Sequence, residues 1–154
     1  MKTKILLTIF LLIFATHCGF SPVYIGNQKP VSVTKIEIIG DKTLAFELEK
    51  KLNFIKDEKS TNSYSFKAQI YDFAESSLVD SRGIAMEEII KLTVSYQFED
   101  KNGTVIYQDS ISKDKRVAVT DNISNNNLIK NNEKKLLLES IIQNISFKPR
   151  VILK

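Results

Sequence analysis

The stretch that decides the fold lies past the middle of the chain, where residues 89–107 read IIKLTVSYQFEDKNGTVIY. From Ile90 to Phe98 apolar side chains alternate strictly with polar ones, which is the pattern of a strand with one face in the core and one in water. Asn102-Gly103 then supplies the residues that a tight hairpin turn needs. The apolar positions resume at Val105, so this stretch predicts an antiparallel β-hairpin.

On the N-terminal side of this hairpin the pattern predicts a strand, a helix and a second strand. Residues 31–39 (VSVTKIEII) are rich in β-branched side chains, and Asp41 or Thr43 can cap a helix after them. The helix is expected to bury a stripe made of Leu44, Leu48, Leu52 and Ile55. Alternation returns over residues 64–70, and the polar stretch 76–83 is expected to form a loop or a ragged strand end.

On the C-terminal side, the fourth strand is expected to hold Val105, Tyr107 and Ile111, with an extension toward Val119. The polar, Asn-rich residues 121–127 are compatible with the start of a helix. A second amphipathic helix, ending before Pro149, is predicted by five apolar positions: Leu137, Leu138, Ile141, Ile142 and Ile145.

The element order is therefore β-α-β-β-β-α. One polar sheet face and two apolar-striped helices predict an α+β fold, a two-layer sandwich with both helices packed on one face of a four-stranded, mostly antiparallel sheet. We expect residues 1–17 to be a signal peptide, 18–30 a lipidated N-terminus and tether, 31–148 a single α+β domain, and 149–154 a C-terminal tail.

The N-terminus has the pattern of a secretory signal. Lys2 and Lys4 precede an eleven-residue apolar run over residues 5–15. As a helix this run would be about 17 Å long, well short of the hydrocarbon core of about 30 Å, so a membrane-spanning helix is the poorer interpretation.

Cys18 is the predicted lipidation site. The sequence Ala15-Thr16-His17-Cys18 resembles a bacterial lipobox, although His17 stands where a small residue is usual. The alternative is that Cys18 merely ends the signal. If it is lipidated, its thiol carries diacylglycerol and its new amine an acyl chain such as palmitate, and each buried methylene contributes about 0.8 kcal/mol to membrane binding. Gly19 is compatible with sorting to the outer membrane.

Composition argues against most catalytic chemistry and against nucleic acid. The chain has one cysteine and one histidine, His17, so cleavage before Cys18 leaves no histidine and no free thiol for catalysis or zinc. Without the signal's two lysines, 20 basic face 18 acidic side chains, too weak an excess for nucleic-acid binding. We therefore expect no enzyme, cofactor or metal. The competing hypothesis is a hydrolase using Asp72 with Glu75, or Glu87 with Glu88.

Two motifs, together with the strand order, resemble one family. Residues 18–24 read CGFSPVY, which is similar to a CGF-x-P-x-Y N-terminus, and residues 94–103 fit the pattern V-x-Y-x-[LF]-x-D-x-x-G. Both resemble the lipopolysaccharide (LPS)-assembly lipoprotein E family, in its alphaproteobacterial form. His17 before the cysteine departs from the family's usual lipobox.

This resemblance implies an outer-membrane lipoprotein, anchored on the periplasmic side or inside a barrel lumen. Such a protein is plug and assembly factor of the large β-barrel LPS translocon and helps deliver lipopolysaccharide to the outer leaflet. A polar sheet face suits a water-filled lumen, although any half-solvated sheet shows the same pattern. The alternative is a periplasm-facing auxiliary lipoprotein of an inner-membrane lipid ABC transporter.

Lipopolysaccharide binding would need cations opposite the phosphates of lipid A. Lys113, Lys115 and Arg116 form the densest basic cluster outside the first helix, and Arg82 is a second candidate. Neither maps onto a family motif, and ordinary solvated side chains account for the same pattern.

Overall fold

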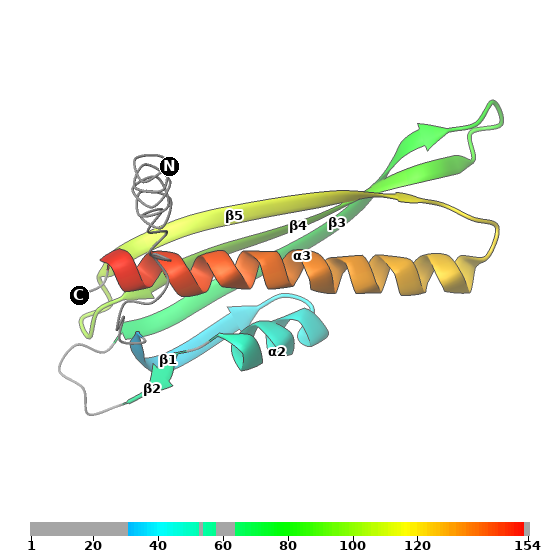
Figure 1. Cartoon of the computed structure of the whole chain (residues 1–154). Coiled ribbons are helices and arrows are strands. Elements are labelled where there is room, and N and C mark those ends of the chain that lie inside the picture. The colour runs from blue at the N-terminus through cyan, green and yellow to red at the C-terminus, as the bar shows by residue number, and fades with distance from the viewer. Residues whose placement is uncertain (1–30, 53, 58–63, 153–154) are drawn as a thin grey trace, which may run out of the picture.

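The computed structural model describes residues 31–52, 54–57 and 64–152, which form one sheet and two helices (Figure 1). The strands are β1 (Ser32–Ile39), β2 (Ile55–Lys56), β3 (Tyr64–Val79), β4 (Ala85–Glu99) and β5 (Val105–Ala118), and the helices are α2 (Lys42–Lys51) and α3 (Ile123–Ile152).

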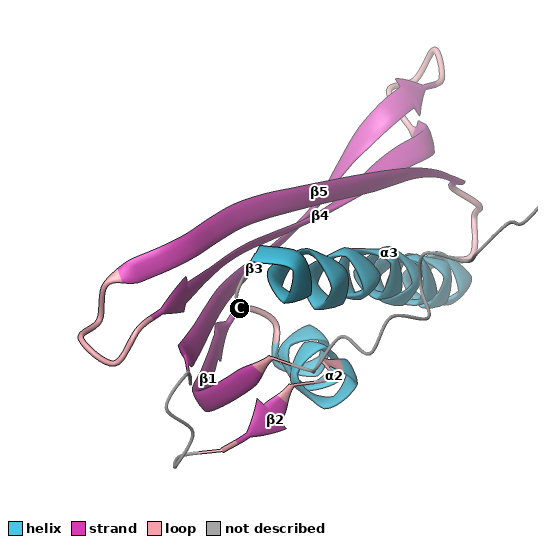
Figure 2. Cartoon of the chain, turned by 60° about the vertical axis from the view of Figure 1, so that its left-hand side comes forward, coloured by secondary structure: helices cyan, strands magenta, loops and turns pink. Residues whose placement is uncertain are grey.

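The sheet has the order β2-β1-β3-β4-β5. β1 is parallel to both β2 and β3, whereas β3, β4 and β5 form antiparallel hairpins. Both helices pack on the same face (Figure 2). The predicted α+β class is confirmed, with five strands in place of four because the two-residue β2 adds an edge strand.

The apolar side chains of the central strand, β4, lie on its buried face, as the alternating sequence predicts. Its apolar positions Ile90, Leu92, Val94 and Phe98 are fully buried, and they face the helices. They meet two further sets of buried side chains. These are Phe66, Ala68 and Ile70 of β3, and Leu138, Ile141 and Ile145 of α3.

Asp41 caps α2, as one of the two expected choices. Its carboxylate accepts hydrogen bonds from the backbone N–H of Thr43 and Leu44, at 2.9 and 3.0 Å. The predicted stripe is correct for Leu44, Leu48 and Leu52, all of which are buried. Ile55 is a correction: α2 ends at Lys51, and Ile55 pairs with Ser32 of β1 as part of β2.

For the segment 76–83 the loop alternative is a second correction, and the alternative of a ragged strand end is the correct one. β3 continues to Val79, and the turn is confined to a few residues before β4 begins at Ala85. Periodicity gives no signal there because both faces of this part of β3 are exposed. Antiparallel pairing with β4 holds it, with register shifts at Ser76/Leu78 and Leu78/Val79.

The end of the second helix is a third correction. α3 does not stop before Pro149 but runs to Ile152, so residues 149–152 of the predicted tail are helical. The lost N–H of Pro149 falls in the last helical turns, where it removes a single intrahelical bond. The proline ring is fully buried.

Ion pairs fix α3 to the sheet. Three lysines of α3 each lie beside a carboxylate of a different strand: Lys130 at 2.6 Å from Glu88 of β4, Lys134 beside Asp72 of β3, and Lys148 at 2.6 Å from Asp109 of β5. The helix is thus attached along its length to all three long strands.

Gly40→Ala is expected to destabilise the fold. Gly40 links β1 to α2 with a φ of 144°, and a Cβ there would lie 2.8 Å from both the Cβ and the carbonyl oxygen of Ile70. The backbone conformation alone should cost about 1–3 kcal/mol of unfolding free energy, and the collision adds to it. Urea denaturation of the purified protein measures the loss. Gly103→Ala is the matched control, because its φ is also positive (79°) but a Cβ would meet nothing within 4 Å; an equal loss in both variants would contradict the collision.

Candidate functional site

The sheet face opposite the helices is uncovered over the described residues (Figure 2). Cross-strand register places alternate residues of four strands on it. Its central positions are polar and uncharged: Gln69 on β3, Thr93, Ser95 and Gln97 on β4, and Gln108, Ser110 and Ser112 on β5. We call this surface the open face.

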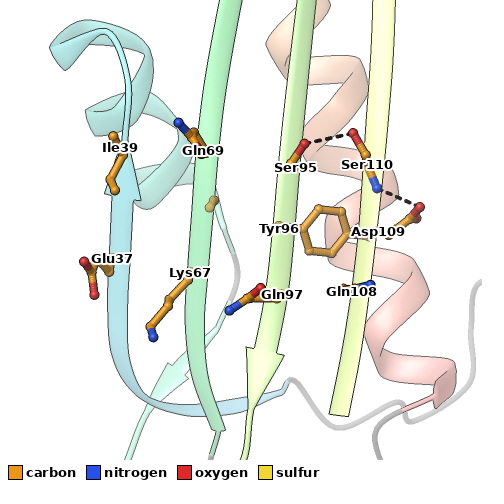
Figure 3. A pocket seen from close by; sticks show the side chains of 11 residues that line it. Glu37, Ile39, Lys67, Gln69, Ser95, Tyr96, Gln97, Gln108, Asp109 and Ser110 are labelled. Atoms are coloured by element: carbon orange, nitrogen blue, oxygen red, sulfur yellow. Dashed lines mark hydrogen bonds between the residues drawn. The ribbon is translucent and has the colours of Figure 1, made fainter. Parts of the chain in front are cut away.

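A shallow groove of about 540 Å³ runs across the open face from β1 to β5 (Figure 3). Its polar lining comes mainly from Gln69, Ser95, Gln97, Gln108 and Ser110. Glu37, Ile39 and Lys67 line it on the side of β1 and β3. The volume lies within the range of about 300–1,000 Å³ that is typical of small-ligand sites.

Hydroxyl groups pair across β4 and β5. The oxygens of Thr93 and Ser112 are 2.9 Å apart, and those of Ser95 and Ser110 are 3.0 Å apart. In each pair one hydroxyl donates to the other, so one hydroxyl hydrogen and several lone pairs remain for a ligand. The open face therefore presents spare donors and acceptors in a row.

A hydrogen-bonded network around Glu99 involves two residues of the groove, Lys67 and Gln97. Glu99 accepts hydrogen bonds from Lys67 Nζ at 2.8 Å, Gln97 Nε2 at 2.7 Å and Ser65 Oγ at 3.3 Å. The bond from Lys67 is the main cause that holds the pKa of Glu99 below its usual range, and the same bond raises the pKa of Lys67. Both groups are thus ionised near neutral pH.

Glu99→Gln is expected to make the unfolding free energy less dependent on pH in the acidic range. A carboxyl whose pKa is depressed in the folded state contributes stability above its unfolded value of about 4.3, and this contribution is lost as the pH falls through the folded pKa. Unfolding free energies measured between pH 7 and pH 3 should therefore fall less steeply in the variant. Glu75→Gln removes an exposed carboxylate of β3 as a control, and equal slopes for Glu99→Gln and the parent protein would refute the assignment.

The predicted basic residues do not gather on one surface. Lys113 and Lys115 share the helix side of the sheet with Leu92 and Ile90, whereas Arg116 is opposite Ile89 on the open face. Arg116 lies 3.9 Å from Glu87, across the strand pair.

Arg82 occupies the β3–β4 turn, where its guanidinium is 2.9 Å from Asp80. Asp80 also accepts the backbone N–H groups of Arg82 and Ile84. The carboxylate thus organises the turn, and Arg82 is not part of the cluster on β5. Cys18 lies outside the described residues.

The carboxylate pairs considered for hydrolysis point apart. Asp72 and Glu88 face the helices, where each lies beside a lysine of α3, while Glu75 and Glu87 belong to the open face. Within the described ranges, no three His, Cys, Asp or Glu residues are grouped as metal ligands would be.

Sequence reasoning identified the polar side of β4 but not the groove. Gln69, Gln108 and Ser110 were missed because their place beside Ser95 and Gln97 depends on the pairing register. The only signal in the sequence is the short run of polar residues on each strand. Among the helices that the structure describes, none is long and apolar enough to cross a membrane.

Solved structures resemble this chain over most of its length. The minor lipoprotein of Acinetobacter baumannii matches 77% of this chain and 93% of its own, with a TM-score of 0.53 and 16% identity. Lipoprotein B of Nitrosomonas europaea matches 76% and 80%, with a TM-score of 0.59 and 11% identity. The chain has the fold of small bacterial lipoproteins. A lipoprotein of Caulobacter crescentus shares this lipoprotein fold over 77% of this chain and 89% of its own, with a TM-score of 0.53 and 12% identity.

No known family profile matches the sequence, and a search of curated proteins finds no significant match. At identities of 11–16% the shared fold is what the likeness establishes.

Proposed function

We propose that the protein is an outer-membrane lipoprotein that acts as plug and assembly factor of the LPS translocon barrel and helps deliver lipopolysaccharide to the outer leaflet. The observation that carries this proposal is the open face of a domain with the lipoprotein fold. The groove on this face is polar, whereas the apolar side chains of the sheet are buried on the opposite face, beneath α2 and α3. A barrel lumen is lined by polar side chains and water, so it suits such a surface.

The CGFSPVY stretch and the central hairpin motif support the same proposal from the sequence. Anchoring would come from lipid on Cys18. The protein would act by binding rather than by catalysis, because neither candidate carboxylate pair converges.

Contacts with lipopolysaccharide phosphates are proposed for the basic residues of β5 and of the β3–β4 turn. Arg116 and Arg82 have side chains that are 70% and 75% exposed, and a guanidinium can bind a phosphate through two parallel hydrogen bonds. Lys113 and Lys115 are also exposed, on the other side of β5. Since these cations face different ways, they would contact separate groups rather than one phosphate.

The test is a pull-down of the tagged full-length protein from detergent-solubilised membranes, with an unrelated tagged outer-membrane lipoprotein as control. Recovery of a large β-barrel protein, absent from the control, supports the proposal. Recovery of only an inner-membrane transporter complex would overturn it and favour the auxiliary-lipoprotein alternative.

A further inference from the structure

The open face carries side-chain hydrogen-bonding groups that the fold does not use. Gln69 and Gln108 are exposed, and within the described residues their side-chain amides make no hydrogen bond. Each amide offers two N–H donors and one carbonyl acceptor. Ser95 lies opposite Gln69, and Ser110 lies opposite Ser95, two residues along β5 from Gln108. The paired hydroxyls of the two serines keep a spare donor. Figure 3 shows Ser95 and Ser110 joined across β4 and β5, with Gln69 on β3 and Gln108 further along β5.

The charged side chains that line the groove on this face have partners of opposite charge. Glu99 lies 2.8 Å from Lys67, and Glu37 lies 3.3 Å from Lys35. A ligand with net charge would gain little from such a surface, because each of these carboxylates already has a cation beside it. Charge complementarity therefore favours an uncharged, hydroxyl-rich ligand.

Two exposed aromatic rings lie further along β3, beyond the groove. Tyr71 and Phe73 follow Gln69 on the open face, opposite Thr93 and Lys91, and they are 53% and 55% exposed. A pyranose ring has an apolar face of C–H groups and a rim of hydroxyls. Exposed rings beside amides and hydroxyls match both parts of a sugar.

We propose that the open face is a binding site for a neutral oligosaccharide, with Gln69, Gln108 and the Ser95–Ser110 pair contacting its hydroxyls and Tyr71 and Phe73 its ring faces. The inference goes beyond the barrel partnership and does not depend on it. The sugar could come from a free glucan or from the glycan of a membrane lipid, and the two share this chemistry.

Isothermal titration calorimetry of the full-length protein tests the proposal. The detergent must be a polyoxyethylene ether, because maltoside and glucoside headgroups are themselves sugars. The probes are maltoheptaose, laminariheptaose and a lipid-free polysaccharide chain of neutral hexoses released from lipopolysaccharide, with a heparin hexasaccharide as anionic comparator. Binding of a glucan or of the lipopolysaccharide chain identifies the source of the sugar.

We expect at least one neutral probe to bind more tightly than heparin. The double variant Gln69→Ala/Gln108→Ala should weaken that binding at least tenfold, and Tyr71→Ala should weaken it as a second variant. Gln143→Ala, on an exposed position of α3, is the matched control and should leave it unchanged. Circular dichroism checks that each variant is folded.

Binding of no neutral probe, tighter binding of heparin, or unchanged affinity in the double variant would overturn the proposal. If the parent protein binds no sugar and the double variant no longer recovers the barrel in the pull-down, the open face would be assigned to barrel contact. Failure of the pull-down with sugar binding intact would instead reject the barrel role alone.

Discussion

Cys18→Ser is expected to abolish incorporation of labelled palmitate and to remove the protein from the outer-membrane fraction. The thioether to diacylglycerol requires the cysteine sulfur, and a serine hydroxyl does not replace it. Two or three acyl chains hold a protein firmly, since each buried methylene contributes about 0.8 kcal/mol and one chain alone anchors only marginally.

Palmitate labelling and sucrose-gradient fractionation measure this outcome, and mass spectrometry of the N-terminus identifies the cleavage site. The variant should keep its leader and move to the inner membrane, because cleavage by the lipoprotein peptidase also needs the modified cysteine. Ser21→Ala is a nearby control that should label normally. A labelled, correctly sorted Cys18→Ser variant would show that the anchor lies elsewhere.

Phe98→Ala is expected to lower the unfolding free energy by about 3–5 kcal/mol, which is the usual cost of emptying a large aromatic site in a core. Phe98 is fully buried, and its ring centroid lies 5.1 Å from that of Phe66 and 5.6 Å from that of Phe54. The ring joins β3 and β4 to the segment after α2, so the cavity would open where three parts of the chain meet.

The shift of the urea midpoint, at an unchanged slope, measures this loss in the purified protein. Phe46→Ala is the matched control, because Phe46 is 64% exposed on α2 and its removal leaves no cavity. Similar urea midpoints for the two variants would show that burial of the Phe98 ring does not contribute the expected stability.

The element order and the central hairpin were predictable because burial imposes a period on the sequence. Ile90 to Phe98 alternate since one side of β4 faces α3, and Leu44, Leu48 and Leu52 recur since one side of α2 faces the sheet. Where burial ceases, the period ceases as well. The end of β3 is therefore ambiguous in the sequence, between a loop and a ragged strand end, and pairing with β4 extends the strand to Val79.

Local sequence patterns do not predict which strands pair with one another. β2 consists of Ile55 and Lys56 and exists only because β1 lies beside it. The groove is likewise a product of register, since Gln69, Ser95 and Gln108 are far apart in sequence. Conversely, Lys115 and Arg116 are neighbours in sequence but face opposite sides of β5. The basic cluster in the sequence therefore does not form one positively charged surface.

The β3–β4 ribbon gives the domain a long axis. β3 has 16 residues, which at about 3.3 Å per residue makes roughly 50 Å. A bilayer with its headgroups is about 40–45 Å thick. In Figure 1 the turn with Arg82 lies at the far end of this axis from the start of β1. Seated upright in the proposed lumen with β1 toward the periplasm, the molecule would span the membrane from end to end and bring its tip to the cell exterior.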